Sequence, residues 1–221
     1  MDNILHLQTG ILDVNTYILK LNEKQAAVID PGGNADEILA LLKKHNLDLM
    51  AVVLTHSHFD HIGGADELLK AFPQCKFYAH KEEAAYLGDN LKQKQCDAFG
   101  SGGLGFYIMN SLPESVREPD VLLEGGETLF EDSDNFAGGF KVLHTPGHSA
   151  GSICLYCAAA GLLISGDTMF AGSCGRTDLT GGSQEAMKTS LKKLGTLPSE
   201  TVVLPGHGGS TTIGDFPFGY F

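Results

Sequence analysis

Hydrophobic residues in the first half of the chain fall into short runs that have the length and spacing of β-strands. Apolar residues that alternate with polar ones, or that follow one another over a few positions, predict strands. Four such runs cover residues 14–21, 25–30, 49–54 and 76–79. The run 49–54 is apolar throughout, which is typical of a strand that is buried on both faces.

Apolar residues spaced three and four positions apart predict helices, because this spacing places them on one helical face. The predicted helices cover residues 34–46, 63–72, 80–87 and 183–194. Residues 89–118 show no such spacing and are rich in glycine and polar residues, so we expect them to be irregular. A loop of this length commonly covers a cleft, and we expect 89–118 to form a lid or a substrate loop.

Further strands are predicted in the second half of the chain, at residues 121–123, 128–130, 140–144, 152–157, 162–165 and, as the last, 202–204. Each half therefore has several strands followed by helices, without strict alternation of strand and helix. This order favours two sheets packed face to face with helices outside, a four-layer α/β sandwich. No linker or repeat divides the chain, so residues 1–221 are predicted to form a single domain.

Composition narrows the class of protein. With 43% hydrophobic and 19% charged residues, the chain can bury a substantial core. Its formal net charge of −12 disfavours binding to a nucleic-acid backbone. No apolar run approaches the roughly 18 residues of a membrane span, and the first residues show no signal peptide. Five dispersed cysteines suit a reducing compartment, so a cytoplasmic protein without a membrane or nucleic-acid partner is predicted.

Four metal-ligand residues stand within six positions directly after the apolar run 49–54. They are His56, His58, Asp60 and His61. His56 and His58 are two residues apart, so in extended backbone they project to the same side and can share one ion. Asp60 and His61 follow in a tight turn that aims them differently, toward a neighbouring ion. Imidazole and carboxylate groups are ligands of Zn, Fe and Mn, and zinc is the commonest for a histidine-rich set.

Three further ligand-type residues occupy the ends of later predicted strands. His148 and His207 each follow a Pro-Gly pair after a strand, and Asp167 follows the strand 162–165. Loops at strand ends on a rigid scaffold commonly carry functional side chains. Together with the first four residues they form a set of seven, which predicts two divalent metal ions.

The motifs that carry these residues resemble those of a known family. Residues 55–64, T-H-S-H-F-D-H-I-G-G, look like the T-H-x-H-x-D-H-x-x-G signature of the metallo-β-lactamase fold superfamily. The stretches 144–149, 165–168 and 205–207 resemble its remaining motifs in the same order. The resemblance implies the four-layer αββα sandwich of the metallo-β-lactamase type. Within this superfamily, residues 175–178, G-R-T-D, resemble the corresponding stretch of the glyoxalase-II-like thioester hydrolases and of the persulfide dioxygenases.

Carried over by position, the resemblance implies how the seven residues share two ions. His56, His58 and His148 would hold the first metal, Asp60, His61 and His207 the second, and Asp167 would bridge them. Two dications held roughly 3.5–4 Å apart lower the pKa of a shared water toward 7. The resulting hydroxide would attack a thioester, such as a hydroxyacylglutathione, with Asp60 and Asp167 as the predicted catalytic residues. The expected partner is thus a small acyl-thiol substrate.

Six other residues are candidates for contacts around this site. They are His144, Cys174, Arg176, Asp178, Phe106 and Tyr107. Arg176 and Asp178 either brace the loop beside the metals or form a plain surface ion pair, and Cys174 either lines the pocket or is a buried thiol. The two aromatic residues, in the segment 89–118, would form apolar pocket walls.

Two other activities remain open within the same superfamily. A persulfide dioxygenase would use a single iron held by three of the same ligands, and a lactonase or β-lactamase would hydrolyse a different bond. Longer glyoxalase-II-like members carry a C-terminal helical extension, whereas this chain ends 14 residues after His207. The thiol carrier is therefore expected to bind the segment 89–118 and the tail 215–221, or the substrate is not a glutathione thioester.

Overall fold

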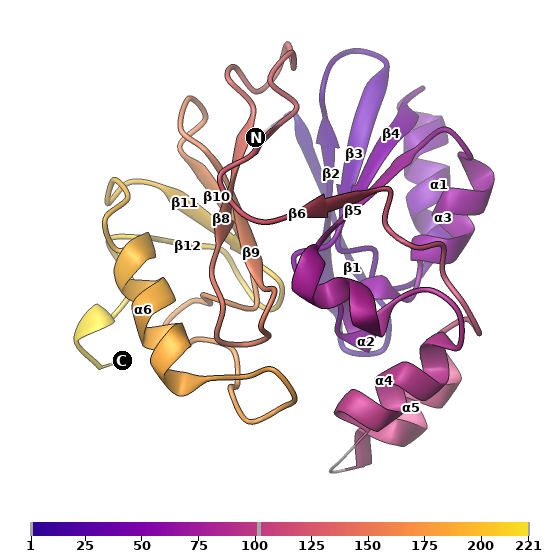
Figure 1. The fold of residues 1–221 in the computed structure, drawn as a ribbon. Helices are drawn as coiled ribbons and strands as arrows, with labels where there is room; N and C mark the ends of the chain where they lie inside the picture. Colours follow the sequence, from indigo (N-terminus) through magenta and orange to yellow (C-terminus); the bar gives the residue numbers. More distant parts are fainter. Residues whose placement is uncertain (1, 101–102, 221) are drawn as a thin grey trace. The chain divides into compact units, whose positions relative to one another are not determined.

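The computed structural model of the protein describes residues 2–100 and 103–220, and Figure 1 traces the fold. The chain divides into two compact units, Met1–Leu122 and Leu123–Phe221. The described residues form two six-stranded sheets, one built from β1 to β6 and the other from β7 to β12. The single domain expected over residues 1–221 stays a prediction beside this division.

The first sheet has its strands in chain order, β1-β2-β3-β4-β5-β6. Its strands are Ile4–Thr9, Val14–Lys20, Gln25–Ile29, Asp48–Val53, Lys76–His80 and Val121–Leu123. The pairs β1–β2 and β2–β3 are antiparallel, whereas β3–β4 and β4–β5 are parallel. Because parallel strands end at the same edge of a sheet, the residues that follow β3 and β4 lie close together. β1 has no counterpart among the predicted strands.

The strand β4 differs from its prediction at one position. Ala51 and Val53 are buried as expected, but Met50 is 41% exposed. Burial on both faces therefore holds only for the C-terminal half of the strand. This is the half that leads into the ligand-rich loop.

Helices α1 (Ala35–Lys44) and α3 (Ala65–Ala71) contact each other and lie along the first sheet (Figure 1). Ile38 of α1 and Leu68 of α3 are fully buried, as the three- and four-residue spacing predicted. Between β4 and α3 the chain makes the single-turn helix α2 (Phe59–Ile62). The predicted helix at 80–87 is a 3₁₀ helix, Lys81–Tyr86.

The expectation that residues 89–118 are irregular was wrong. This segment contains α4 (Leu91–Phe99) and α5 (Leu104–Ser111), which contact each other. The buried positions of α4 are Leu91, Gln95 and Phe99, and the polar residue in the middle of this stripe conceals the helical pattern. Residues 101–102 lie outside the described part of the chain, and the lid role of the segment stays a prediction.

The second sheet has the order β12-β11-β10-β9-β8-β7. Its strands are Thr128–Leu129, Phe140–His144, Ile153–Cys157, Leu162–Gly166, Val202–Pro205 and Thr211–Thr212. β10 and β11 are parallel, and the other neighbours are antiparallel. The strand β12 contradicts the prediction that residues 202–204 are the last strand; a two-residue strand is too short to give a hydrophobic pattern.

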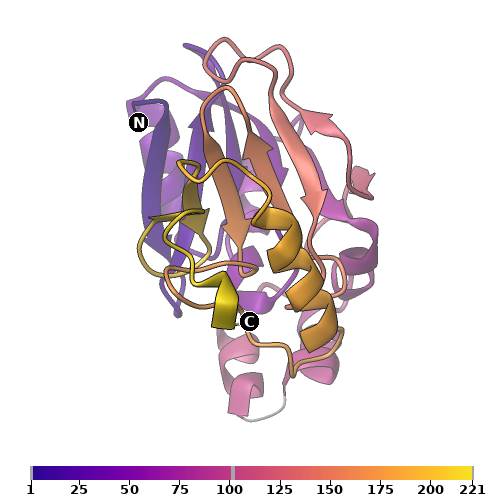
Figure 2. The ribbon, with the colours of Figure 1, turned by 90° about the vertical axis from the view of Figure 1, so that its left-hand side faces the viewer.

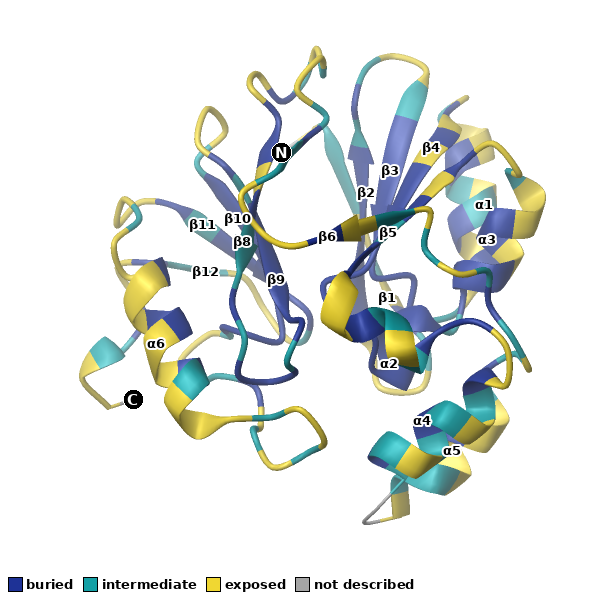
Figure 3. Ribbon diagram, in the orientation of Figure 1, coloured by how far each residue is buried: buried dark blue, intermediate teal, exposed yellow. Residues whose placement is uncertain are grey.

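Helix α6 (Gln184–Leu194) lies along the second sheet (Figure 2). It begins at Ser183, whose hydroxyl accepts a hydrogen bond from the Ala186 amide, a standard N-cap arrangement. Met187, Leu191 and Leu194 belong to one buried cluster with residues of β9, β10 and β11. Figure 3 shows this contrast along α6, where buried positions alternate with exposed ones. No helix in the described residues is long and apolar enough to cross a membrane.

Candidate metal centre

The loop after β4 brings the first four predicted ligands together. His56, His58, Asp60 and His61 are all buried. The ring centroid of His56 lies 4.6 Å from that of His58 and 4.1 Å from that of His61. His61 Nε2 lies 3.7 Å from Asp60 Oδ2. The first unit therefore brings its three imidazoles and one carboxylate close together, and their division between two ions stays a prediction.

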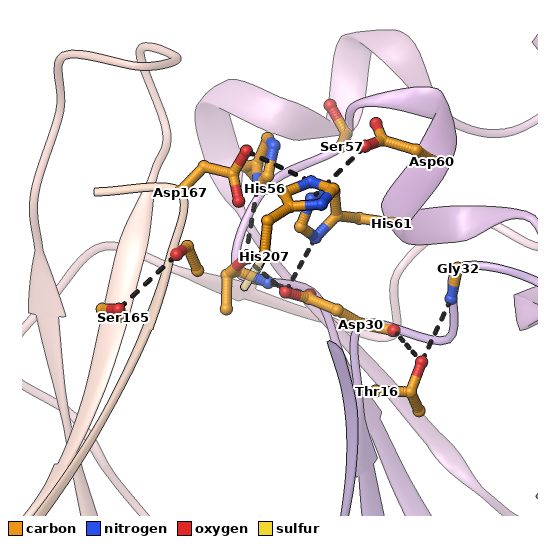
Figure 4. A network of polar contacts seen from close by, with 12 residues as sticks. Thr16, Asp30, Gly32, His56, Ser57, Asp60, His61, Ser165, Asp167 and His207 are labelled. Atoms are coloured by element: carbon orange, nitrogen blue, oxygen red, sulfur yellow. Dashed lines mark hydrogen bonds and ion pairs between the residues drawn. The ribbon is translucent and has the colours of Figure 1, made fainter. Parts of the chain in front are cut away.

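Asp30, which sequence reasoning missed, holds this group from the end of β3. Its carboxylate accepts hydrogen bonds from the Thr55 amide at 2.7 Å and the Thr55 hydroxyl at 2.6 Å. It also lies 3.0 Å from His61 Nδ1 (Figure 4). When Nδ1 donates to this carboxylate, the lone pair of the ring is on Nε2, which is the tautomer needed by a metal ligand. The signal for Asp30 was its place at a strand end, before Pro31.

A close approach of two backbone segments keeps α2 in place. A Cβ atom on Gly32 would lie only 2.2 Å from the Asp60 carbonyl oxygen. The Gly64 amide donates a hydrogen bond to the Pro31 carbonyl at 2.8 Å. Only glycine fits at position 32, so the Pro-Gly-Gly stretch after Asp30 sets the position of the turn that carries Asp60 and His61.

The second unit brings the other three predicted ligands together. His148 Nε2 and His207 Nε2 lie 3.5 and 3.6 Å from Asp167 Oδ2. Asp167 follows β10 and His207 follows β11, and these strands are parallel neighbours, so both side chains arise at the same edge of the sheet. Asp167 and His148 are buried, and the His207 side chain is 29% exposed. The Asp167 carboxylate thus lies beside two imidazoles.

Backbone groups of residues 175 and 176 hold two of these ligands. His148 Nδ1 lies 2.8 Å from the Arg176 carbonyl oxygen, to which it donates. The Gly175 amide donates to the Asp167 carbonyl at 3.0 Å. A Cβ atom on Gly175 would lie 2.1 Å from that carbonyl oxygen and 2.9 Å from His148 Nδ1, so this contact requires glycine. As in the first unit, an Nδ1 bond leaves Nε2 as the ligand atom.

A buried polar network connects the loops that carry His148 and Asp167. The Thr145 hydroxyl lies 3.0 Å from the Thr168 hydroxyl and 3.3 Å from the Cys154 sulfur. Burial raises the pKa of the Cys154 thiol to about 11, so this cysteine is neutral at physiological pH. Cys154 and Thr145 therefore contribute packing and hydrogen bonds between the loops that carry His148 and Asp167.

The remaining predicted site residues of the second unit have local partners. His144 Nε2 lies 2.9 Å from the Ala150 carbonyl oxygen. The Arg176 side chain makes two hydrogen bonds to the exposed Asp178 carboxylate, at 2.6 and 2.7 Å. Hydrogen bonding to Arg176 lowers the pKa of Asp178 to about 2. Cys174 is half-buried and packs against the core of the second unit.

The two predicted aromatic residues lie on α5. Phe106 is 72% exposed and Tyr107 is 45% exposed. Their ring centroids lie 5.8 Å apart. Their role as pocket walls stays a prediction.

The donor chemistry fits a metal centre. The seven residues all belong to groups of His and Asp that could hold a metal ion. Neutral imidazole nitrogens and carboxylate oxygens suit Zn, Fe and Mn. The bonds from Asp30 to His61 and from His148 to the Arg176 carbonyl are the outer contacts that commonly orient metal-binding histidines.

Comparison with known proteins gives the chain its relatives. A family model described as the metallo-beta-lactamase superfamily matches residues 9–207. The probable metallo-hydrolase YqgX of Bacillus subtilis is 38% identical over 94% of this chain and 90% of that protein. The hydroxyacylglutathione hydrolase GloC of Haemophilus influenzae is 33% identical over 96% of this chain and 93% of that protein.

Two solved structures share the fold over nearly the whole chain. The B3 metallo-beta-lactamase BLEG-1 has a TM-score of 0.81 at 36% identity, with 96% of this chain and 95% of that chain covered. TTHA1623, solved in a di-iron-bound form, has a TM-score of 0.80 at 35% identity, with 97% and 99% covered. These matches confirm the predicted fold class, the αββα sandwich of the metallo-β-lactamase type.

Proposed function

Because the chain belongs to the metallo-β-lactamase superfamily, we propose that it is a binuclear metal-dependent hydrolase that cleaves a thioester. The observation that carries this proposal is the set of seven His and Asp residues, all of which are buried or half-buried and lie in segments that follow strands. The similarity to a metallo-hydrolase, to a hydroxyacylglutathione hydrolase and to a di-iron protein supports it.

The proposed ligand assignment is the one that the motifs of the superfamily imply. His56, His58 and His148 would hold one ion, and Asp60, His61 and His207 the other. Asp167, whose carboxylate lies beside two imidazoles, would contact both ions. Such a pair of ions supplies Lewis acidity toward a carbonyl oxygen and lowers the pKa of a water molecule. Zinc is the proposed metal, because imidazole dominates the donor set.

The protein's own groups would orient this centre and receive protons. Asp30 and the Arg176 carbonyl fix the tautomers of His61 and His148. Asp60 and Asp167 are the proposed catalytic carboxylates, since both are buried among the imidazoles and can accept a proton from an attacking water. No serine or cysteine nucleophile is needed in this scheme.

The substrate class rests on the relative from Haemophilus influenzae. Its name states that it hydrolyses hydroxyacylglutathione, and this chain covers 93% of its length. This likeness over nearly the whole of both chains supports a thioester substrate for this protein. We propose a small acyl-thiol substrate, and a location in the cytoplasm, because five dispersed cysteines suit a reducing compartment. The identity of the acyl group is a question for the assay.

The test is hydrolysis of S-lactoylglutathione by the metal-loaded protein, followed through the loss of thioester absorbance. We expect the metal-loaded protein to cleave the thioester. Chelation of the metal should lower the rate of hydrolysis by at least about 100-fold, and added zinc should restore it. His148→Ala should lower kcat/KM by about 100-fold or more. His144→Ala is the matched control, because this histidine bonds the Ala150 carbonyl, and it should stay within a few-fold of the unchanged protein.

Two results would contradict the thioester proposal. Hydrolysis of a β-lactam or a lactone without thioester cleavage would place the protein with the lactamases, an outcome that the likeness to BLEG-1 makes a necessary arm of the assay. One iron per chain, with oxygen uptake in the presence of a persulfide, would identify a persulfide dioxygenase instead.

A further inference from the structure

Ser57 stands between the ligands His56 and His58, and three of its polar groups are held by two side chains from other elements. Glu83 Oε2 accepts hydrogen bonds from the Ser57 amide at 2.8 Å and from the Ser57 hydroxyl at 2.5 Å. Gln95 Nε2 donates to the Ser57 carbonyl oxygen at 2.7 Å. We call Glu83 and Gln95 the Ser57 clamp.

Both residues of the Ser57 clamp, and Ser57 itself, are buried from solvent. Ser57, Glu83 and Gln95 each have an exposed fraction of 0%. A buried carboxylate is costly unless several donors stabilise it, and here two donors come from one residue of the ligand loop. Glu83 lies in the 3₁₀ helix Lys81–Tyr86 and Gln95 in α4, so two helical elements meet at this one serine.

The clamp holds polar groups of the loop that are not metal ligands. The His56 and His58 rings contact each other, with centroids 4.6 Å apart, whereas the Ser57 hydroxyl donates to Glu83. Glu83 can therefore fix the loop without competing for a ligand position.

Helix α4 makes a second contact with the ligand loop, one turn beyond Gln95. The Phe99 ring lies edge-on to the His58 ring, with centroids 4.5 Å apart, and Phe99 is buried. Gln95 and Phe99 are four residues apart and therefore lie on one face of the helix. The helix face that carries Gln95 and Phe99 therefore contacts the loop of the candidate ligands.

We propose that Glu83 and Gln95 are positioning residues for the metal centre, which act through Ser57 to fix His56 and His58. This inference rests on the proposed metal function, because it assumes that those two histidines bind an ion. It makes α4 a support of the ligands. A movement of α4 would alter metal affinity as well as access to the site.

The test compares clamp variants with matched controls by metal affinity, measured by competition with a chromogenic chelator. Glu83→Ala and Gln95→Ala should each weaken zinc binding by about 10- to 100-fold, the usual effect of losing an outer contact to a ligand. Glu83→Gln should recover most of the affinity, because its amide oxygen can still accept from the Ser57 amide. The cobalt-loaded Glu83→Ala protein should show a changed visible absorption spectrum.

Two controls separate positioning from general loss of structure. Gln93→Ala is the control for Gln95→Ala, because Gln93 is also a glutamine of α4 but bonds the exposed Asp97. Asp120→Asn is the control for the Glu83 variants, because Asp120 is a carboxylate that accepts from the Phe77 amide. Neither should change zinc affinity by more than a few-fold. The unfolding of the metal-free proteins is measured alongside, so that stability and affinity are recorded separately.

The milder variant Ser57→Ala keeps the test decisive if Glu83→Ala fails to fold. It removes the hydroxyl donor but keeps the bond from the Ser57 amide to Glu83, so it should weaken zinc binding measurably but less than Glu83→Ala does. Clamp variants that lose stability but bind zinc and cobalt like the unchanged protein would overturn the inference. An unchanged protein that binds no metal would instead refute the proposed function.

Discussion

The two units hold their candidate ligands in different ways. The first unit carries four ligands within six residues, and buried side chains of Asp30, Glu83 and Gln95 hold the loop. The second unit collects three ligands from three separate loops, and backbone groups of Gly175 and Arg176 contact Asp167 and His148 directly. Both units need a glycine at a close approach, Gly32 in the first and Gly175 in the second. The difference is that side chains from other elements add contacts to the compact ligand loop of the first unit.

This difference predicts which kind of substitution each unit tolerates. A backbone contact is insensitive to most side-chain changes but fails when a glycine gains a Cβ atom. A side-chain contact fails when a substitution removes the donor or acceptor that the contact needs. The three predictions below test this contrast.

The largest effect is expected for Gly175→Ala in the second unit. The added Cβ would lie 2.1 Å from the Asp167 carbonyl oxygen and 2.9 Å from His148 Nδ1, so the backbone must move away from two ligands. We expect a loss of at least about 3 kcal/mol in the free energy of unfolding, together with loss of zinc binding. Urea unfolding and chelator competition measure the two effects.

Gly209→Ala is the matched control for this prediction. It lies two residues after His207, and a Cβ atom there would meet nothing within 4 Å. Its stability and zinc affinity should resemble those of the unchanged protein. Equal behaviour of the two alanine variants would show that close backbone contact does not determine the second ligand set.

An intermediate effect is expected for Asp30→Asn in the first unit. The amide nitrogen would replace an oxygen beside His61 Nδ1, so the ring must accept there and carry its proton on Nε2, the ligand atom. Zinc affinity should fall by about 10- to 100-fold, while the metal-free protein loses only about 1–2 kcal/mol of stability. Nitrogen chemical shifts of His61 would report the change of tautomer, and an unchanged tautomer would contradict the prediction.

The smallest effect is expected for Asp178→Asn, which removes an exposed side-chain pair, while the Arg176 carbonyl that bonds His148 is kept. The folded-state pKa of Asp178 is lowered to about 2, below the usual value near 4. Any stability that this pair adds is therefore present above the usual pKa and is lost as the pH falls toward 2. Because Asp178 is exposed, the variant should match the unchanged protein at neutral pH in unfolding and zinc-binding assays. A marked loss of zinc binding would show that the side-chain pair, and not the backbone, supports His148.

Sequence alone predicted the ligands better than the residues that hold them. His56, His58, Asp60 and His61 stood out because their spacing after an apolar strand is rare by chance. Gln95 gave no signal, because a polar residue in a polar stretch is normally exposed, and its burial depends on a partner 38 positions away. The same residue concealed α4, so segment 89–118 was predicted to be irregular. Asp30 could have been found, since an acidic residue at a strand end before Pro-Gly-Gly often has a structural role.

The strand predictions succeeded where burial gave long apolar runs and failed at the margins. β8 matches its predicted bounds, and β2, β3, β9, β10 and β11 match theirs within a residue or so. β1 and β12 were missed. In β1 several side chains are only half-buried, so its alternation is weak, and β12 has two residues. Local pattern therefore found the edge strands β6 and β7 but missed the half-buried β1 and the two-residue β12.

The parallel pairing of β3 with β4, and of β10 with β11, places every functional loop at one end of its sheet. The opposite ends carry short turns instead, at residues 22–24 before β3 and 158–161 before β10. These turns are natural sites for a fluorescent label or an inserted affinity tag. Immobilisation there would leave the reactive edge of each sheet open, which suits the protein to single-molecule or surface-bound assays.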